Sequence, residues 1–145
     1  QTEISHAVLL MICHPDLKNT QERAASFESG FRSAYRGDLT VIKVNGQGIY
    51  KAAFRVALDA FKMNENISVV FGVNDHSALA GIEAGERADR DISVYATGGE
   101  SPNFVGRLAE RGALRAVAAF FPEVVGARGI DLIVGALAGR PLKGR

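Results

Sequence analysis

Short, continuous apolar runs alternate five times with stretches whose apolar residues recur at helical spacing, and this alternation constrains the fold more than any other feature. The five runs are predicted strands and cover residues 6–12, 39–44, 67–73, 92–96 and 116–121. Continuous apolar runs are typical of strands that are covered on both faces of a sheet. Because parallel strands need helical crossovers, the alternation predicts an α/β fold: an open parallel sheet with helices on both faces.

Five amphipathic helices are expected between and after these strands. They are predicted from about Asn19 to Gly37, from Ile49 to Asn64, around Leu79 and Ile82, from Pro102 to Arg111, and from Pro122 to Leu137. Asp75 or Ser77 is expected to cap the third helix, because short polar side chains accept hydrogen bonds from the first free backbone amides. In the last helix, Gly126, Ile130, Ile133, Val134 and Leu137 share one apolar face.

Length and composition indicate one globular domain without a bias towards nucleic acid. The chain has 145 residues, 47% of them hydrophobic, and a formal net charge of +1. Its single cysteine, Cys13, excludes an intrachain disulfide. No apolar run is long enough to span a membrane, and no signal-peptide pattern is recognised. Because the chain begins with Gln1 rather than Met, we interpret it as a fragment of a longer protein.

Polar side chains follow the predicted strands, and the carboxyl ends of parallel strands meet at one edge of a sheet. These segments are Cys13-His14-Pro15-Asp16, Asn45-Gly46-Gln47, Asn74-Asp75-His76, Thr97-Gly98-Gly99-Glu100 and Phe120-Phe121. Ligands of open α/β sheets bind in the crevice beyond this edge. Of the two phenylalanines, alternation along a strand predicts one ring in the core and one facing outward. The sequence therefore predicts a site for a small polar molecule.

Several enzyme classes are disfavoured by spacing. The segment after the first strand reads CHPDLKNT and lacks the glycines of a dinucleotide-binding turn, and no phosphate-binding P-loop occurs. Cys13 with His14 or His76 leaves a small α/β hydrolase as one alternative, although a cysteine that ends a buried strand is more often a small apolar residue. The spacing of these three residues is not that of a metal site, so neither a metal nor a cofactor is expected.

Three candidate residues have both a structural and a functional interpretation. Asn74 and Asp75 could both serve as helix caps, but a cap needs only one of them, which favours a ligand contact for the other. Arg23 could be a solvated helical charge, and its place on the second turn of the first helix also brings it near the edge of the sheet.

Four stretches recur in the same order and spacing in one superfamily: NTQERAASFESGFRSAY, ISVVFGVNDHSALAGIEA, DISVYATGGE and GALRAVAAFFPEVVGARGIDLIVGALAGRPL. The chain resembles the C-terminal lobe of type I periplasmic sugar-binding proteins. It is also similar to the effector-binding domains of lactose-repressor-like regulators. The resemblance implies that residues 1–121 form a ligand-binding lobe and that residues 122–145 hold a helix that crosses back to a second lobe.

The resemblance also implies roles for single residues. Arg23 matches the arginine that binds sugar hydroxyls, and Asn74 matches the asparagine of the family's ligand-binding corner, which leaves helix capping to Asp75. His14, Asp16, Glu100 and Phe120 complete the expected ligand-binding set by their positions at strand ends. The chain departs from the family where Gly98 replaces an acid and Phe120 replaces a glutamine. A pyranose would lose two partners there, and Glu100 could substitute for the acid.

These observations predict a non-enzymatic solute-binding protein that takes a sugar or sugar-like ligand for an ABC-type importer. Its partners would be that ligand and a membrane permease, with a homodimer of the chain also expected, and it would be periplasmic or a lipoprotein on the extracellular face. The alternative is the effector-binding domain of a lactose-repressor-like regulator in the cytoplasm. In neither case would this domain itself bind nucleic acid.

Overall fold

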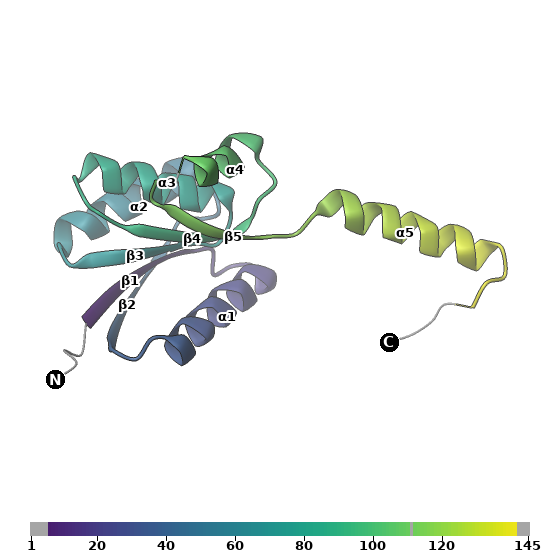
Figure 1. Ribbon diagram of the computed structural model, residues 1–145, viewed down its shortest axis with the longest axis horizontal. Helices are drawn as coiled ribbons and strands as arrows, with labels where there is room; N and C mark the ends of the chain where they lie inside the picture. The colour runs from purple at the N-terminus through teal and green to yellow at the C-terminus, as the bar shows by residue number, and fades with distance from the viewer. Residues whose placement is uncertain (1–5, 111, 142–145) are drawn as a thin grey trace.

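The computed structural model of the chain describes residues 6–110 and 112–141. Strands and helices alternate along it (Figure 1) as β1 (His6–Cys13), α1 (Lys18–Ala34), β2 (Asp38–Asn45), α2 (Tyr50–Met63), β3 (Ile67–Gly72), α3 (Asp75–Arg87), β4 (Ser93–Gly98), α4 (Pro102–Ala109), β5 (Leu114–Ala119) and α5 (Pro122–Leu137). The strands form one five-stranded parallel sheet in the order β2-β1-β3-β4-β5. The predicted fold class, an open parallel sheet with helices on both faces, is confirmed.

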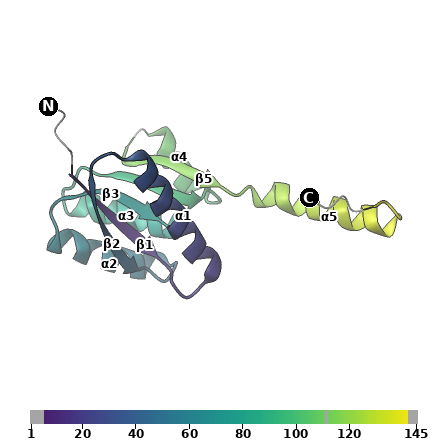
Figure 2. The same cartoon turned by 90° about the horizontal axis from the view of Figure 1, so that it is seen from below.

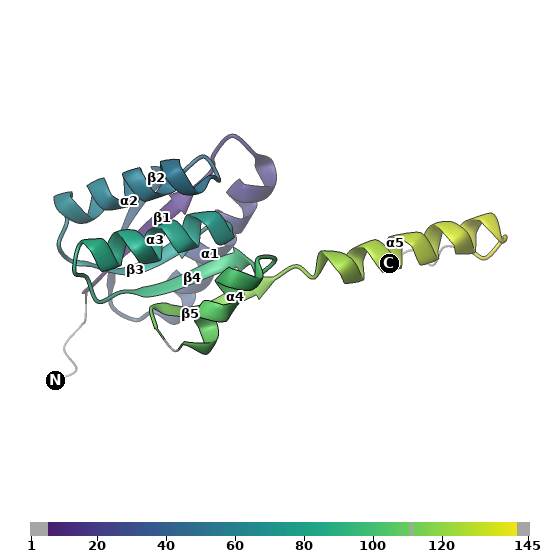
Figure 3. The ribbon, with the colours of Figure 1, turned by 90° about the horizontal axis from the view of Figure 1, so that it is seen from above.

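The helices divide unequally between the two faces of the sheet. Helices α2, α3 and α4 lie on one face and α1 lies on the other (Figure 1; Figure 3). The larger apolar core lies under α2 and α3 and includes the fully buried Phe61 and Val70. The smaller core lies under α1, where the ring of Phe27 stacks on that of Phe71 with 4.2 Å between ring centres. Helix α1 therefore covers mainly the middle of its face.

The pairing register brings the carboxyl ends of the strands to one level. Cys13 pairs with Asn45 at the ends of β1 and β2, and Gly98 pairs with Ala119 at the ends of β4 and β5. Neighbouring strands β1 and β3 are followed by α1 and α3, which lie on opposite faces of the sheet (Figure 1). This point is where a doubly wound sheet opens a crevice for a ligand.

The fifth strand ends earlier than the sequence predicts. It stops at Ala119, so Phe120 and Phe121 belong to the connection to α5. Phe121 has a left-handed backbone, with φ of 48°, which breaks the strand. The expectation that one of the two rings enters the core is wrong, because Phe120 is 37% exposed and Phe121 is 59% exposed.

Helix α5 projects beyond the carboxyl edge of the sheet, away from the other elements, in all three ribbon views (Figure 2). Its large apolar side chains are 52% to 85% exposed, and its one buried residue is Gly135. The described part of this helix therefore does not fold back on its own sheet. Residues 142–145 of the predicted crossing segment, and Arg111 at the predicted end of the fourth helix, lie outside the described residues.

Candidate functional site

Asn74 sits where β3 passes into α3, and its side chain makes two hydrogen bonds. Its Oδ1 accepts from the backbone N–H of Ser77 at 2.9 Å, which makes Asn74 the N-cap of α3. Its Nδ2 donates to the carbonyl of Gly48 at 2.9 Å, which ties this corner to the loop between β2 and α2. The assignment of capping to Asp75 or Ser77 is therefore wrong, because Asn74 itself supplies the cap.

Asp75 instead holds the loop between β4 and α4. Its carboxylate accepts three backbone hydrogen bonds, from Gly99 at 2.6 Å, Glu100 at 2.9 Å and Ser101 at 2.8 Å. Its side chain is buried, and hydrogen bonds to a buried charged group are among the stronger ones in proteins. The carboxylate thus fixes the path of the chain that carries Glu100 along the edge of the sheet.

The position of Asp75 explains why the chain has glycine at position 98. Gly98 has φ of 131°, a region that side chains rarely adopt, and a Cβ atom there would lie 2.3 Å from the Asp75 Oδ1. An acid at this position is therefore incompatible with the Asp75 contacts. Any carboxylate offered by this loop must come from Glu100, whose side chain is exposed.

Arg23 is on α1, and its side chain reaches the carboxyl edge of the sheet. Its Nη1 donates to the Val73 carbonyl at 3.3 Å, and the hydroxyl of Thr97 donates to the same oxygen at 2.8 Å. The guanidinium carbon is 4.2 Å from the centre of the Phe120 ring, a cation–π contact. Arg23 is thus held between the residue that precedes Asn74 and the residue that follows β5.

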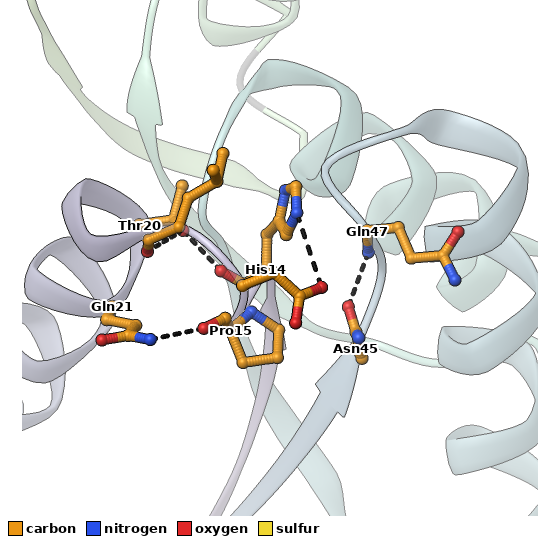
Figure 4. A network of polar contacts seen from close by, with 8 residues as sticks. His14, Pro15, Thr20, Gln21, Asn45 and Gln47 are labelled. Carbon is orange, nitrogen blue, oxygen red and sulfur yellow. Dashed lines mark hydrogen bonds and ion pairs between the residues drawn. The ribbon is translucent and has the colours of Figure 1, made fainter.

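His14 and Asp16 follow β1 on the other side of the crevice. The His14 Nε2 is 3.8 Å from an oxygen of the mostly exposed Asp16 carboxylate (Figure 4). The hydroxyl of Thr20 donates to the His14 carbonyl, and the Gln21 amide donates to the Pro15 carbonyl, so the first turn of α1 shapes this loop. These bonds position the His14 side chain at the edge of the sheet.

Gly48 is a member of this edge that sequence reasoning missed. A Cβ atom at Gly48, where φ is 67°, would lie 2.8 Å from the His14 Nδ1 and 3.4 Å from the Asn74 Nδ2. Its backbone therefore runs between two of the predicted site residues. The turn-forming NGQG segment was the available signal for it.

Two cavities flank α1, and each includes one predicted site residue. A cavity of about 630 Å³ between α1 and β2 is lined by His14, Cys13 and Asn45 among others. A cavity of about 640 Å³ on the other side of α1, over β4 and β5, is lined by Arg23 and Thr97 among others. The structure places Arg23 beside Phe120. It places Asn74 and His14 on either side of Gly48. Helix α1 separates the two cavities.

The environment of Cys13 does not suit a nucleophile. Burial raises the pKa of the Cys13 thiol, an effect that Lys43 partly opposes, and nucleophilic cysteines instead need a lowered pKa. Within residues 6–110 and 112–141, no group of three or more His, Cys, Asp or Glu side chains could hold a metal ion. In the same described part, no helix is both long and apolar enough to cross a bilayer.

Solved structures that are similar to this chain include solute-binding proteins of ABC transporters. An ABC transporter periplasmic solute-binding protein from Actinobacillus succinogenes 130z with bound D-allose has a TM-score of 0.85 at 18% identity, over 95% of this chain and 48% of its own. One from Agrobacterium vitis bound with α-D-tagatopyranose has a TM-score of 0.81 at 21% identity, over 95% and 46%. A periplasmic sugar-binding protein from Pseudomonas fluorescens has a TM-score of 0.78 at 19% identity, over 97% and 42%. No family model and no curated protein sequence matches the chain.

The chain has the fold of one lobe of the type I periplasmic binding proteins. It spans about half the length of the solved chains it matches. The fold predicted from the sequence resemblance is therefore confirmed by structural comparison.

Proposed function

We propose that this chain is a lobe of a non-enzymatic solute-binding protein that holds a small polar ligand, a sugar or a sugar-like solute, for an ABC-type importer. The observation that carries the proposal is the edge of the sheet at which Arg23 stacks on Phe120 and contacts the residue before Asn74. Guanidinium and amide N–H groups suit hydroxyl and carbonyl oxygens, and the exposed aromatic ring offers an apolar surface. The fold supports this proposal because the solved proteins that share it include two with bound sugars.

The ligand-binding set that we propose is Arg23, Asn74, His14, Asp16, Glu100 and Phe120. Among these, Arg23 and Asn74 would be the central donors, since each keeps N–H groups beyond its one intramolecular donation at this edge. Glu100 would supply the acceptor that Gly98 cannot carry. The proposed partner is a membrane permease, and the proposed location is the periplasm or a lipid anchor on the outer face of the membrane.

Residues 122–145 are proposed to pack against a second lobe in the full-length protein. The exposed apolar face of α5 supports this arrangement, because exposed patches of this kind mark interaction surfaces. In such an arrangement the ligand lies between two lobes, and this lobe alone covers only part of it.

Titration calorimetry with D-allose and D-tagatose, carried out on the full-length protein, tests the proposed function. We expect saturable binding that weakens at least tenfold in an Arg23→Ala variant. As a matched control, Arg55→Ala removes an exposed arginine of α2 that lines neither of the two cavities beside α1, and this variant should bind normally. If a wider set of pentoses, hexoses and sugar acids also fails to bind, the sugar assignment is wrong.

A further inference from the structure

Arg23 is a half-buried cation to which the lobe gives no counter-charge. Within residues 6–110 and 112–141 its guanidinium forms no ion pair, and its hydrogen bond is the donation to the Val73 carbonyl at 3.3 Å. The hydroxyl of Thr97 donates to the same oxygen at the shorter distance of 2.8 Å, so this carbonyl satisfies little of the guanidinium. Arg23 therefore keeps most of its N–H donors, and its whole charge, for another group.

Two carboxylates that come near Arg23 along the chain are bound elsewhere. Glu22 precedes it on α1, but its carboxylate lies 3.8 Å from the Lys18 ammonium. Asp75 comes two residues after the carbonyl that Arg23 contacts, and its carboxylate accepts the three backbone N–H groups of residues 99–101. Neither acid pairs with the guanidinium.

The loop after β4 supplies no counter-charge either. Gly98 has no room for an acidic side chain, because a Cβ atom there would meet the Asp75 carboxylate. Glu100 is exposed and forms no ion pair with Arg23 in the described part of the chain. Its carboxylate stays available to accept hydrogen bonds from the hydroxyls of a ligand.

Phe120 holds the guanidinium in an orientation that suits a carboxylate. The guanidinium carbon of Arg23 lies 4.2 Å from the centre of the Phe120 ring. A guanidinium on an aromatic face presents its N–H groups along its edges, where two parallel hydrogen bonds can bind both oxygens of one carboxylate. The cavity beside Arg23, of about 640 Å³, lies within the range of small-molecule sites, roughly 300–1,000 Å³.

The charge of Arg23 selects among polar ligands. A ligand that covers Arg23 removes water from the guanidinium, and a buried cation without a partner is costly. The hydroxyls of a neutral sugar accept hydrogen bonds but bring no charge, whereas a carboxylate brings both acceptors and charge. A phosphate carries nearly two charges and would leave an excess beside Asp75 and Glu100. We propose, on the basis of the proposed function, that the ligand is a sugar acid with one carboxylate, which Arg23 binds.

Calorimetry on the full-length protein with matched pairs of ligands tests this proposal. D-glucuronate and D-galacturonate differ from D-glucose and D-galactose only at C6, and D-gluconate and D-galactonate extend the panel to acids at C1. We expect at least one sugar acid to bind at least tenfold more tightly than its parent sugar. The methyl ester of that acid keeps the carbonyl without the charge, so it should bind no more tightly than the parent sugar.

Two variants assign this preference to one side chain. Arg23→Gln keeps an amide donor and removes the charge, so it should abolish the preference for the acid. Arg55→Gln makes the same exchange at an exposed arginine of α2 and should leave the preference intact. Circular dichroism shows whether each variant is folded.

The outcomes separate this proposal from the proposed function. Parent sugars that bind as tightly as every acid would show that the counter-charge of Arg23 comes from outside this lobe; they would overturn the proposal and leave the proposed function standing. A preference that survives Arg23→Gln would also overturn it. If neither the acids nor the neutral sugars bind, the proposed function itself is wrong.

Discussion

The guanidinium of Arg23 lies over the ring of Phe120 at 4.2 Å, although the two residues come from the first helix and from the connection that follows the last strand. The contact fixes a cation at the edge of the sheet. If Phe120 orients Arg23, then Phe120→Ala should weaken ligand binding by the full-length protein about as much as one cation–π contact is worth, roughly 0.5–2 kcal/mol. Phe121→Ala, which changes the more exposed neighbouring ring, is the matched control for calorimetry.

Asn74 combines a helix cap with a donor at the proposed site, and two substitutions separate these roles. Asn74→Ala loses both hydrogen bonds, so we expect it to lower the free energy of unfolding by about 1–2 kcal/mol and ligand binding by about 1–3 kcal/mol. Asn74→Asp keeps the cap and loses the donation to Gly48. Because a carboxylate oxygen then faces the Gly48 carbonyl, we expect this variant to lose stability through that contact while its cap remains, and to bind poorly. Binding as tight as that of the wild type in both variants would remove Asn74 from the site.

Asp75 should prove more important for holding the loop between β4 and α4 in place than for contact with a ligand. Asp75→Ala leaves three backbone N–H groups without their acceptor, and we expect a loss of at least about 1.5–3 kcal/mol, the contribution of one hydrogen bond to a charged group. Hydrogen exchange at Gly99, Glu100 and Ser101 should accelerate, while exchange within β1 stays slow relative to it. Unchanged protection of these three amides would contradict the clamp described above.

Gly98 offers a steric test of the same clamp. Gly98→Ala should destabilise the fold by about 1–3 kcal/mol, because the backbone angle is unsuited to a side chain and the new Cβ atom meets the Asp75 carboxylate. Gly106→Ala is the control, since no atom outside its own helix lies within 4 Å of a Cβ atom there. In the double variant with Asp75→Ala, the cost of Gly98→Ala should fall. Simple addition of the two costs in chemical unfolding would exclude a direct clash.

Tyr50 on α2 predicts that the stability of the fold depends on pH in the alkaline range. Its hydroxyl donates to the Glu83 carboxylate, and this bond together with burial raises the pKa of Tyr50 to about 12. Because the pKa is higher in the folded protein than the ordinary value of 10, the stabilisation is complete below pH 10 and is lost as the pH rises through 12. Ultraviolet titration should show one tyrosine of high pKa that moves towards 10 in Glu83→Gln. A titration unchanged by that substitution would contradict the assignment.

Much of the fold could be predicted because the apolar runs and helical spacings are local signals. The end of β5 could not, since Phe120 and Phe121 continue an apolar run and only the left-handed backbone at Phe121 ends it. The position of Asn74 at the edge of the sheet could be predicted, because it follows from the strand that precedes this residue. The choice of Asn74 over Asp75 as the cap depends on contacts with Gly48 and with residues 99–101, which are distant in the sequence. The direction of α5 depends on which surface its apolar face meets, and periodicity does not encode that.

The central claim, that this lobe holds a small polar solute, is tested most directly by native mass spectrometry of the full-length protein purified without denaturation. The account predicts one small polar molecule, of sugar-like composition, bound to each protein molecule. That adduct should be lost in the double variant Arg23→Ala and Asn74→Ala, and it should persist in the Arg55→Ala control. An adduct that survives the double substitution, or a protein that carries no ligand and binds none from a panel of sugars and sugar acids, would contradict the claim.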